Sequence, residues 1–228
     1  MKRINQYITE KLKISKPSKV NIKHTLFPTN KKELQEMIEQ EIKQNGNECS
    51  LNHIDTSKIT NMTELFFLSK FNGDISEWNV SNVTNMNFMF KRSDFNGDIS
   101  NWDTSNVISM RAMFWDSQFN GDISDWDVRS LEDTAAMFWS SQFNGDIFNW
   151  DVSNIKTTSY MFYDSKFDQD ISDWDVSNVE NMKSMFEQSK FNHDISKWVI
   201  NKNCKTESMF VNCPIEDKYR PFKDGEGL

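Results

Sequence analysis

Residues 71–94 read FNGDISEWNVSNVTNMNFMFKRSD, and close variants of this string recur every 24 residues along the chain. A fixed period of roughly 20–50 residues is typical of proteins built from stacked repeats. The period therefore predicts one elongated repeat unit and argues against an enclosed active-site pocket. Six Met-Phe pairs keep the step, from Met89-Phe90 to Met209-Phe210, and so do six phenylalanines from Phe71 to Phe191. Six tryptophans also keep it: Trp78, Trp102, Trp126, Trp150, Trp174 and Trp198.

One copy of the repeat contains signals for both strand and helix. Asn72-Gly73 favours a turn with positive φ, and residues 74–78 that follow are long enough for one short strand. The apolar residues within 83–90 then recur at helical offsets. The sequence thus predicts an α/β repeat fold: a right-handed solenoid of short parallel strands and short α or 3₁₀ turns.

The chain divides into four segments. Residues 1–19 form a basic leader, and residues 20–50 form a strand-plus-helix cap over the first repeat. Residues 51–213 hold about seven 24-residue repeats, of which the first copy is degenerate and the last decays after its tryptophan. Residues 214–228 form a charged tail that we expect to cover the last repeat.

The cap has its own local signals. Apolar and polar residues alternate over 20–26, as in a half-buried strand. Asn30 followed by Glu33 is a capping-box start for a helix, and Asn45-Gly46 is a helix stop. Open repeat ends expose apolar surface and unpaired backbone, so a cap is expected there.

The charge is unevenly distributed. The chain has a net charge of −8, but residues 1–32 carry nine Lys/Arg and one acidic residue, a net of +8, so the remainder carries −16. An acidic body argues against nucleic-acid binding, which needs a basic stripe. Cys49, Cys204 and Cys213 are too few and too scattered for a disulfide framework.

No apolar run approaches the roughly 18 residues of a membrane span, and the N-terminus lacks the continuous apolar stretch of a secretory signal. A cytoplasmic or virion-associated location is therefore expected rather than export.

The repeat string FNGDISxWDVSNVTNMxxMFxxS resembles the BspA-like leucine-rich-repeat surface protein family, whose repeats read WDVSNVTNM and MF. The resemblance covers about residues 51–213, and the Lys-Glu-Leu segment before them is similar to that family's N-terminal cap. It implies a right-handed solenoid with a role in binding or adhesion and no enzymatic activity. The leader lies outside the family pattern.

Two columns of the repeat vary and carry aromatic residues. The position after each Met-Phe pair accepts lysine and glutamate as well, which predicts solvent exposure. Clusters of exposed aromatic residues mark interaction surfaces. These side chains either form a partner-binding ridge or fold back onto the neighbouring coil. The candidates are Phe67, Trp115, Trp139 and Tyr163 after the Met-Phe pairs, and Phe88 and Tyr160 three residues earlier in their own copies.

Repeated aspartates allow two interpretations. One column runs from Asp74 to Asp194 and a second from Asp103 to Asp175. They either accept backbone N–H bonds at turns or bind a cation that relieves their repulsion. No His/Cys metal spacing, phosphate loop or Ser-His-Asp arrangement is present, so no metal site, cofactor or catalytic residue is predicted.

The basic leader is either a segment without a role or a targeting or docking peptide. It is similar to short N-terminal tags of proteins packaged into tailed-phage capsids, with Glu10 as the cleavage position. The primary hypothesis is a non-enzymatic module that binds a protein or glycan through its repeat surface. The alternative is a structural or capsid-packaged protein delivered by its leader. The sequence does not fix the oligomeric state.

Overall fold

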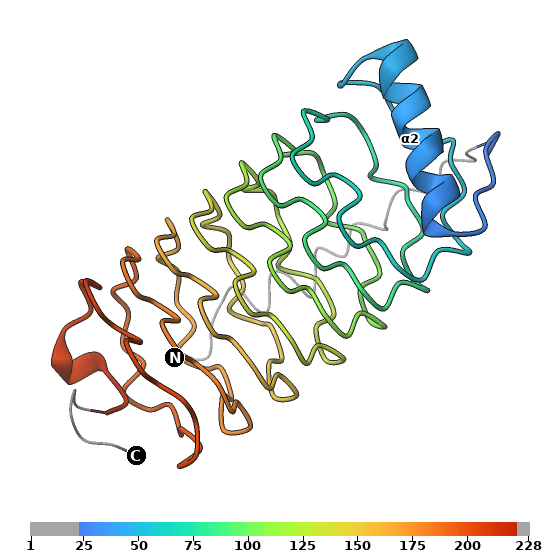
Figure 1. Ribbon diagram of the computed structural model, residues 1–228. Coiled ribbons are helices and arrows are strands. Elements are labelled where there is room, and N and C mark those ends of the chain that lie inside the picture. Colours follow the sequence, from blue (N-terminus) through green and yellow to red (C-terminus); the bar gives the residue numbers. More distant parts are fainter. Residues whose placement is uncertain (1–22, 223–228) are drawn as a thin grey trace, which may run out of the picture.

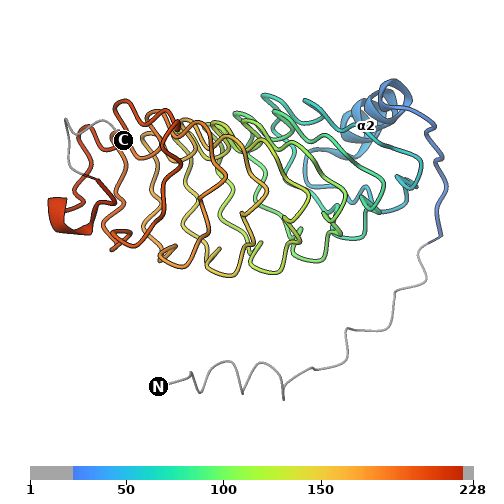
Figure 2. The same cartoon turned by 90° about the horizontal axis from the view of Figure 1, so that it is seen from below.

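A computed structural model describes residues 23–222, which form an elongated stack of similar coils (Figure 1). The described residues contain one α-helix, α2 (Lys31–Asn45), and one 3₁₀ helix, η1 (Asp217–Tyr219). The α-helix lies at the N-terminal end of the stack and η1 at the C-terminal end, so both lie outside the regular coils (Figure 2).

Neighbouring coils are joined along one side by a ladder of parallel backbone contacts. Successive bridges link positions 24 residues apart, from Asn61 to Asn85 and onward to Lys205. Around each bridge, alternate N–H groups donate to the next coil, as when Met62 donates to the Asn85 carbonyl at 2.9 Å and Glu64 to the Asn87 carbonyl at 3.0 Å. All bridges within residues 23–222 are isolated, so none extends into a strand.

The ladder side of each coil is a run of overlapping β-turns. In the coil of residues 86–93, Met89 donates to the Met86 carbonyl at 3.2 Å. Two further turns of this coil are closed in the same way, each by an N–H group that donates to the carbonyl three residues earlier. Phe88 and Arg92 have φ of 59° and 54°. A type II turn requires positive φ at its third residue, and these residues occupy that position. Positive φ recurs at both places in every coil, at fourteen non-glycine residues from Glu64 to Asn212.

The predicted fold class is therefore wrong. The structure has no strands and no helical turns inside the described coils, where the sequence predicts a leucine-rich-repeat-like solenoid of strands and α or 3₁₀ turns. Apolar residues that recur every three positions fit consecutive i to i+3 turns as well as they fit a helix. The left-handed residue that two overlapping turns share prevents a helix from forming. Residues 74–78 also form a turn, closed by Trp78 donating to the Ile75 carbonyl at 3.2 Å.

The core consists of columns of the same residue type, stacked coil on coil. The phenylalanines of the Met-Phe pairs and those that open each repeat are almost fully buried. Their rings stack within a coil at 4.3 Å (Phe114 with Phe119) and between coils at 5.7 Å (Phe114 with Phe138). The register tryptophans form a parallel column, and each donates its indole N–H to a carbonyl of the preceding coil, as Trp126 does to Ile99 at 3.0 Å.

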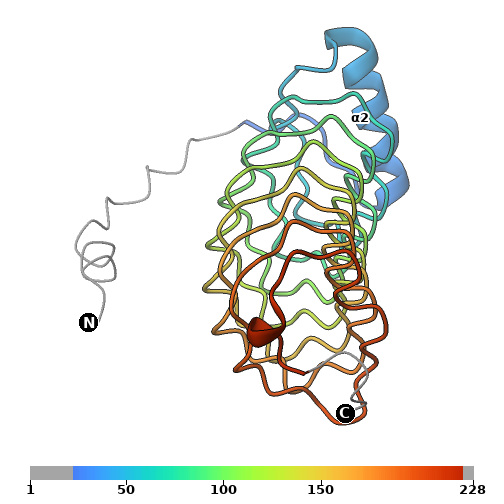
Figure 3. The same cartoon turned by 90° about the vertical axis from the view of Figure 1, so that its left-hand side faces the viewer.

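The cap helix forms where the sequence predicts it. Asn30 accepts the N–H of Glu33 at 3.1 Å, and Gly46 follows the helix with φ 85°. Leu34 and Ile38 are buried against the first coil, and α2 covers one side of the N-terminal end (Figure 3). The predicted strand over 20–26 is wrong for the described part of that segment, which contains one bridge, from Leu26 to Ile54.

Candidate interaction surface

Six aromatic side chains lie in a row on the ladder side of the stack, and we call them the aromatic ridge. They come from the turn that follows each Met-Phe pair and from the left-handed position three residues earlier. The turns place these side chains outside the Phe and Met core. The ridge consists of Phe67, Phe88, Trp115, Trp139, Tyr160 and Tyr163.

The centre of the ridge is a continuous ring stack. Trp115 and Trp139 lie 4.5 Å apart between ring centroids, with planes 9° apart. Trp139 also stacks on Tyr160 at 5.3 Å and contacts Tyr163 at 4.8 Å. Ala112 and Ala136 are buried three residues before the two tryptophans, and their small side chains leave room for the indoles. The sequence candidates are thus brought into direct contact across three coils.

Lys91 continues the row toward the N-terminal end. Its Nζ lies 3.8 Å from the centroid of Trp115, 5.4 Å from Phe88 and 5.6 Å from Phe67. Ammonium groups are attracted to aromatic faces at such distances. Burial and then the nearby Arg92 charge lower the pKa of Lys91, and Glu64 opposes the shift. Lys91, which the sequence analysis does not single out, therefore links Phe67 and Phe88 to Trp115.

The ridge is neither core nor free surface. Phe67 is 40% exposed, and the other five rings are partly exposed. The stacked rings cover one another's faces along the stack axis, so their edges face solvent. Within residues 23–222 the indole N–H groups of Trp115 and Trp139 have no acceptor, whereas every register tryptophan has one. The two ridge tryptophans therefore keep a donor that a partner can use.

Charged side chains flank the ridge, and several are paired. Arg92 lies 3.3 Å from Asp116, and Arg111 lies 3.8 Å from Asp133. Toward the C-terminal end, Gln188 donates to the Tyr163 hydroxyl at 2.8 Å. Burial raises the pKa of Tyr163, with smaller contributions from Glu187 and Asp164. Arg92 and Arg111 are thus neutralised by aspartates, whereas Glu187 and Asp164 add negative charge beside Tyr163.

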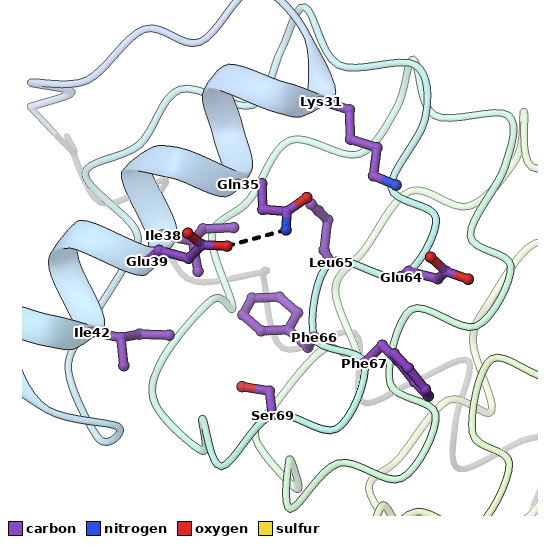
Figure 4. A pocket seen from close by; sticks show the side chains of 10 residues that line it. All are labelled: Lys31, Gln35, Ile38, Glu39, Ile42, Glu64, Leu65, Phe66, Phe67 and Ser69. Carbon is purple, nitrogen blue, oxygen red and sulfur yellow. Dashed lines mark hydrogen bonds between the residues drawn. The ribbon is translucent and has the colours of Figure 1, made fainter.

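A pocket of about 320 Å³ lies between α2 and the first coil, next to Phe67 (Figure 4). Ile38, Ile42, Leu65 and Phe66 contribute its apolar wall, and Gln35 bonds to Glu39 at its polar edge at 3.1 Å. The sequence analysis missed this pocket, because the packing of α2 on the coil sets its shape and no motif marks it.

The aspartate columns act as turn caps. Asp98 accepts the N–H of Ser100 at 2.9 Å, and Asp151 accepts that of Ser153 at 3.2 Å. Asn79 does the same for Ser81 at 3.1 Å, so a neutral amide serves equally at this position. No group of three or more His, Cys, Asp or Glu residues in the described chain is arranged to hold a metal ion. The geometry thus explains these columns by backbone capping.

Some sequence predictions fall outside the described residues. Glu10 and the leader of residues 1–19 belong to this part of the chain, so their proposed roles stay predictions. Among residues 23–222, no helix combines the length and apolarity needed to cross a membrane.

Two overlapping parts of the chain match one family model, at residues 32–142 and 118–218. The model is described as "Mycoplasma protein of unknown function, DUF285". The chain belongs to the DUF285 family. The double match reflects the repeat itself, and it supports the resemblance to BspA-like proteins only at the level of this repeat. No curated protein and no solved structure matches the chain. Since the DUF285 description assigns no function, a function has to be argued from the surface geometry.

Proposed function

We propose that this chain is a non-enzymatic binding module that recognises a protein partner through the aromatic ridge. The observation that carries the proposal is the partly exposed stack of Trp115, Trp139 and Tyr163, whose two indole N–H groups have no acceptor within residues 23–222. Tryptophan and tyrosine are the side chains most often found as anchors in protein interfaces. A rigid coil stack holds them in place, so little entropy is lost on binding.

A protein partner fits the ring geometry better than a glycan does. A sugar stacks on an exposed aromatic face, but the central rings use their faces on one another and on Lys91. Ring edges and free indole N–H groups remain for a partner. Edges suit aliphatic and aromatic side chains, and the N–H groups suit backbone or side-chain carbonyls.

The non-enzymatic part of the proposal rests on the pocket beside α2. Its ten lining residues include one hydroxyl side chain, Ser69, and no histidine or cysteine. A serine nucleophile needs a base within hydrogen-bonding reach, but the Ser69 hydroxyl accepts the Phe71 N–H at 3.1 Å and, within residues 23–222, makes no hydrogen bond to either carboxylate of the pocket. We therefore place the function on the ridge.

The test separates folding from binding. We would replace Trp115, Trp139 and Tyr163 together with serine, and compare this triple variant with wild type in affinity capture from an extract of the native source. The matched control replaces Ile108 and Val199, two exposed apolar residues outside the ridge, with serine. We expect captured proteins to be lost with the ridge variant only, while thermal melting shows both variants folded. Equal capture by the ridge variant and wild type would contradict the proposal.

A further inference from the structure

The column that contains the ridge tryptophans is symmetric about its middle residue. Trp139 has three column members on either side, each one coil further away. The two neighbours are aromatic, the next two are charged with opposite sign, and the outermost two are exposed apolar residues. Read from the N-terminal end, the column is Phe67, Lys91, Trp115, Trp139, Tyr163, Glu187 and Val211.

The two charged members make no direct salt bridge within the described chain, although Glu64 acts on Lys91 from a greater distance. Neither Lys91 nor Glu187 forms a salt bridge within residues 23–222, whereas the neighbouring Arg92 pairs with Asp116. The Lys91 ammonium group lies over the rings of Phe67, Phe88 and Trp115. Charges of opposite sign that form no salt bridge of their own and lie at equal distances from a centre are what a self-complementary surface requires.

The two outermost members complete the pattern. Phe67 is 40% exposed and Val211 is 46% exposed, and both belong to the small set of exposed large apolar residues. They lie at opposite ends of the stack, three coils from Trp139. A two-fold rotation about Trp139 would bring Phe67 of one copy opposite Val211 of another, so each exposed apolar side chain would gain an apolar neighbour.

We propose that the ridge binds a second copy of this chain in an antiparallel, two-fold symmetric dimer. The two-fold axis passes through the contact between the two Trp139 side chains. Lys91 of each copy then faces Glu187 of the other, Trp115 faces Tyr163, and Phe67 faces Val211. This is the same patch used twice, as closed two-fold interfaces require. The inference rests on the proposed function, because it names the partner of the same ridge.

The charges select the antiparallel arrangement. A parallel dimer along the same column would place Lys91 on Lys91 and Glu187 on Glu187. Like charges facing each other in an interface disfavour association, whereas the antiparallel register converts both contacts into opposite-charge pairs. The contact is about 30 Å long from the spacing of seven coils and few side chains wide. Because specific interfaces of this size are at the small end, we expect a dissociation constant on the order of micromolar.

The test is a charge exchange followed by sedimentation velocity, using the full chain from about 1 to 200 µM to bracket that constant. We expect wild type to form a dimer with rising concentration. Lys91→Glu and Glu187→Lys should each weaken it by on the order of tenfold or more, because two opposite-charge contacts become repulsive. The double variant should dimerise again. A mixture of the two single variants should form a heterodimer, because both of its charge pairs are attractive.

The matched controls are Lys156→Glu and Glu180→Lys. Both residues are exposed and lie seven residues before Tyr163 and Glu187, off the column, and both variants should dimerise like wild type. Thermal melting of each variant shows whether it is folded, which matters because Lys91→Glu also removes the contact with Trp115. A wild type that stays monomeric at all concentrations would overturn the proposal. So would a dimer that the single variants do not weaken, or two single variants that do not associate when mixed.

The result is separable from that of the capture experiment. A monomeric wild type whose serine-substituted ridge still loses captured proteins would overturn the dimer and leave a foreign partner on the ridge. A dimer that responds to the charge exchange, with no ridge-dependent capture, would assign the ridge to self-association alone. Failure of both experiments would remove the ridge as a binding surface.

Discussion

The chain uses tryptophan in two places, and the two sets behave differently. The register tryptophans are 3–5% exposed, stack 6.5 Å apart where neighbouring rings are in contact, and donate their indole N–H groups to the backbone. The ridge tryptophans, Trp115 and Trp139, stack more closely at 4.5 Å, remain partly exposed, and have no acceptor for their N–H groups within residues 23–222. Stacking is therefore common to both, whereas burial and hydrogen bonding separate a core role from a surface role.

The difference shows how repeats assign roles to positions. A column that is nearly constant in this chain, such as that of Trp126, where the first copy alone has isoleucine (Ile54), fills the space between coils and fixes their spacing. A column that accepts Phe, Lys, Trp, Tyr, Glu and Val has no such requirement, so its residues are free to serve a partner. Variation among copies within one chain thus points to the surface.

The largest effect on stability should come from replacing a tryptophan with alanine, once in the register column and once, in a separate variant, in the ridge. Trp126→Ala removes a buried ring and its backbone hydrogen bond, and should lower the free energy of unfolding by about 3–5 kcal/mol. Trp139→Ala removes a partly exposed ring and should cost about 1–2 kcal/mol, mainly lost ring contacts. Urea unfolding measures both. Equal losses would show that the ridge is part of the core.

The glycines that lie two residues after the phenylalanines that open each repeat should show a second, smaller difference in stability. A Cβ on Gly73 would lie 2.0 Å from the Cys49 backbone carbonyl oxygen, whereas a Cβ on Gly145 meets the Phe143 ring at 2.8 Å. Gly73→Ala should therefore cost about 2–3 kcal/mol, as overpacking does. Gly145→Ala should cost about 1 kcal/mol or less, because Gln169 and His193 occupy the same column in later coils. Unfolding curves in which the Gly145→Ala variant is less stable than the Gly73→Ala variant would contradict this account.

The turn ladder predicts an effect of about 1 kcal/mol at exposed left-handed positions. Leu68 has φ 57° and is 58% exposed. Leu68→Val places a β-branched side chain at positive φ and should destabilise the chain. Leu68→Gly relieves the backbone strain and should be neutral or stabilising. Thermal melting distinguishes the two, and a valine variant as stable as the glycine variant would mean that the turn does not limit this position.

The smallest effect concerns the aspartate caps. Hydrogen bonds from the side chain and backbone of Ser177 lower the pKa of Asp175 below its ordinary value of 3.8. A depressed folded-state pKa gives stability that is present above the unfolded pKa and is lost as pH falls through the folded pKa. Asp175→Asn keeps the acceptor, as Asn79 does in its own coil. It should leave stability at pH 7 nearly unchanged and reduce the loss below about pH 4. Acid unfolding that is as steep in the variant as in wild type would contradict the assignment.

Part of the fold could be predicted from the sequence. The period gave the stack and its core columns, and the Asn30 and Glu33 pair gave the start of α2. The strands and helical turns were wrong because a three-residue apolar spacing has two structural solutions. The residues at positive φ include Phe88, Ala112 and Tyr160. No glycine occupies either column of left-handed positions, so the usual signal of a type II turn is absent. None of the fourteen is β-branched or proline, and this is the signal that could have been found.

The candidate site was predictable in its residues and not in its geometry. Reading the column after each Met-Phe pair selects Trp115, Trp139 and Tyr163, and the structure places them in one row. Two features could not be obtained from the column. One is the position of Lys91 on the face of Trp115, and the other is the pocket beside α2, since both depend on side-chain packing.

The 24-residue period already specifies which core columns stack, because it places equivalent side chains above and below one another in successive coils. Packing between the coils, which the sequence pattern does not specify, sets how the backbone reaches that register and which rings stay partly exposed. Backbone hydrogen bonds between coils select consecutive turns over strands and helices, because each turn then sends alternate N–H groups to the next coil. The packing of Phe and Met inside those turns leaves the following residue outside the core, and this places the ridge on the surface.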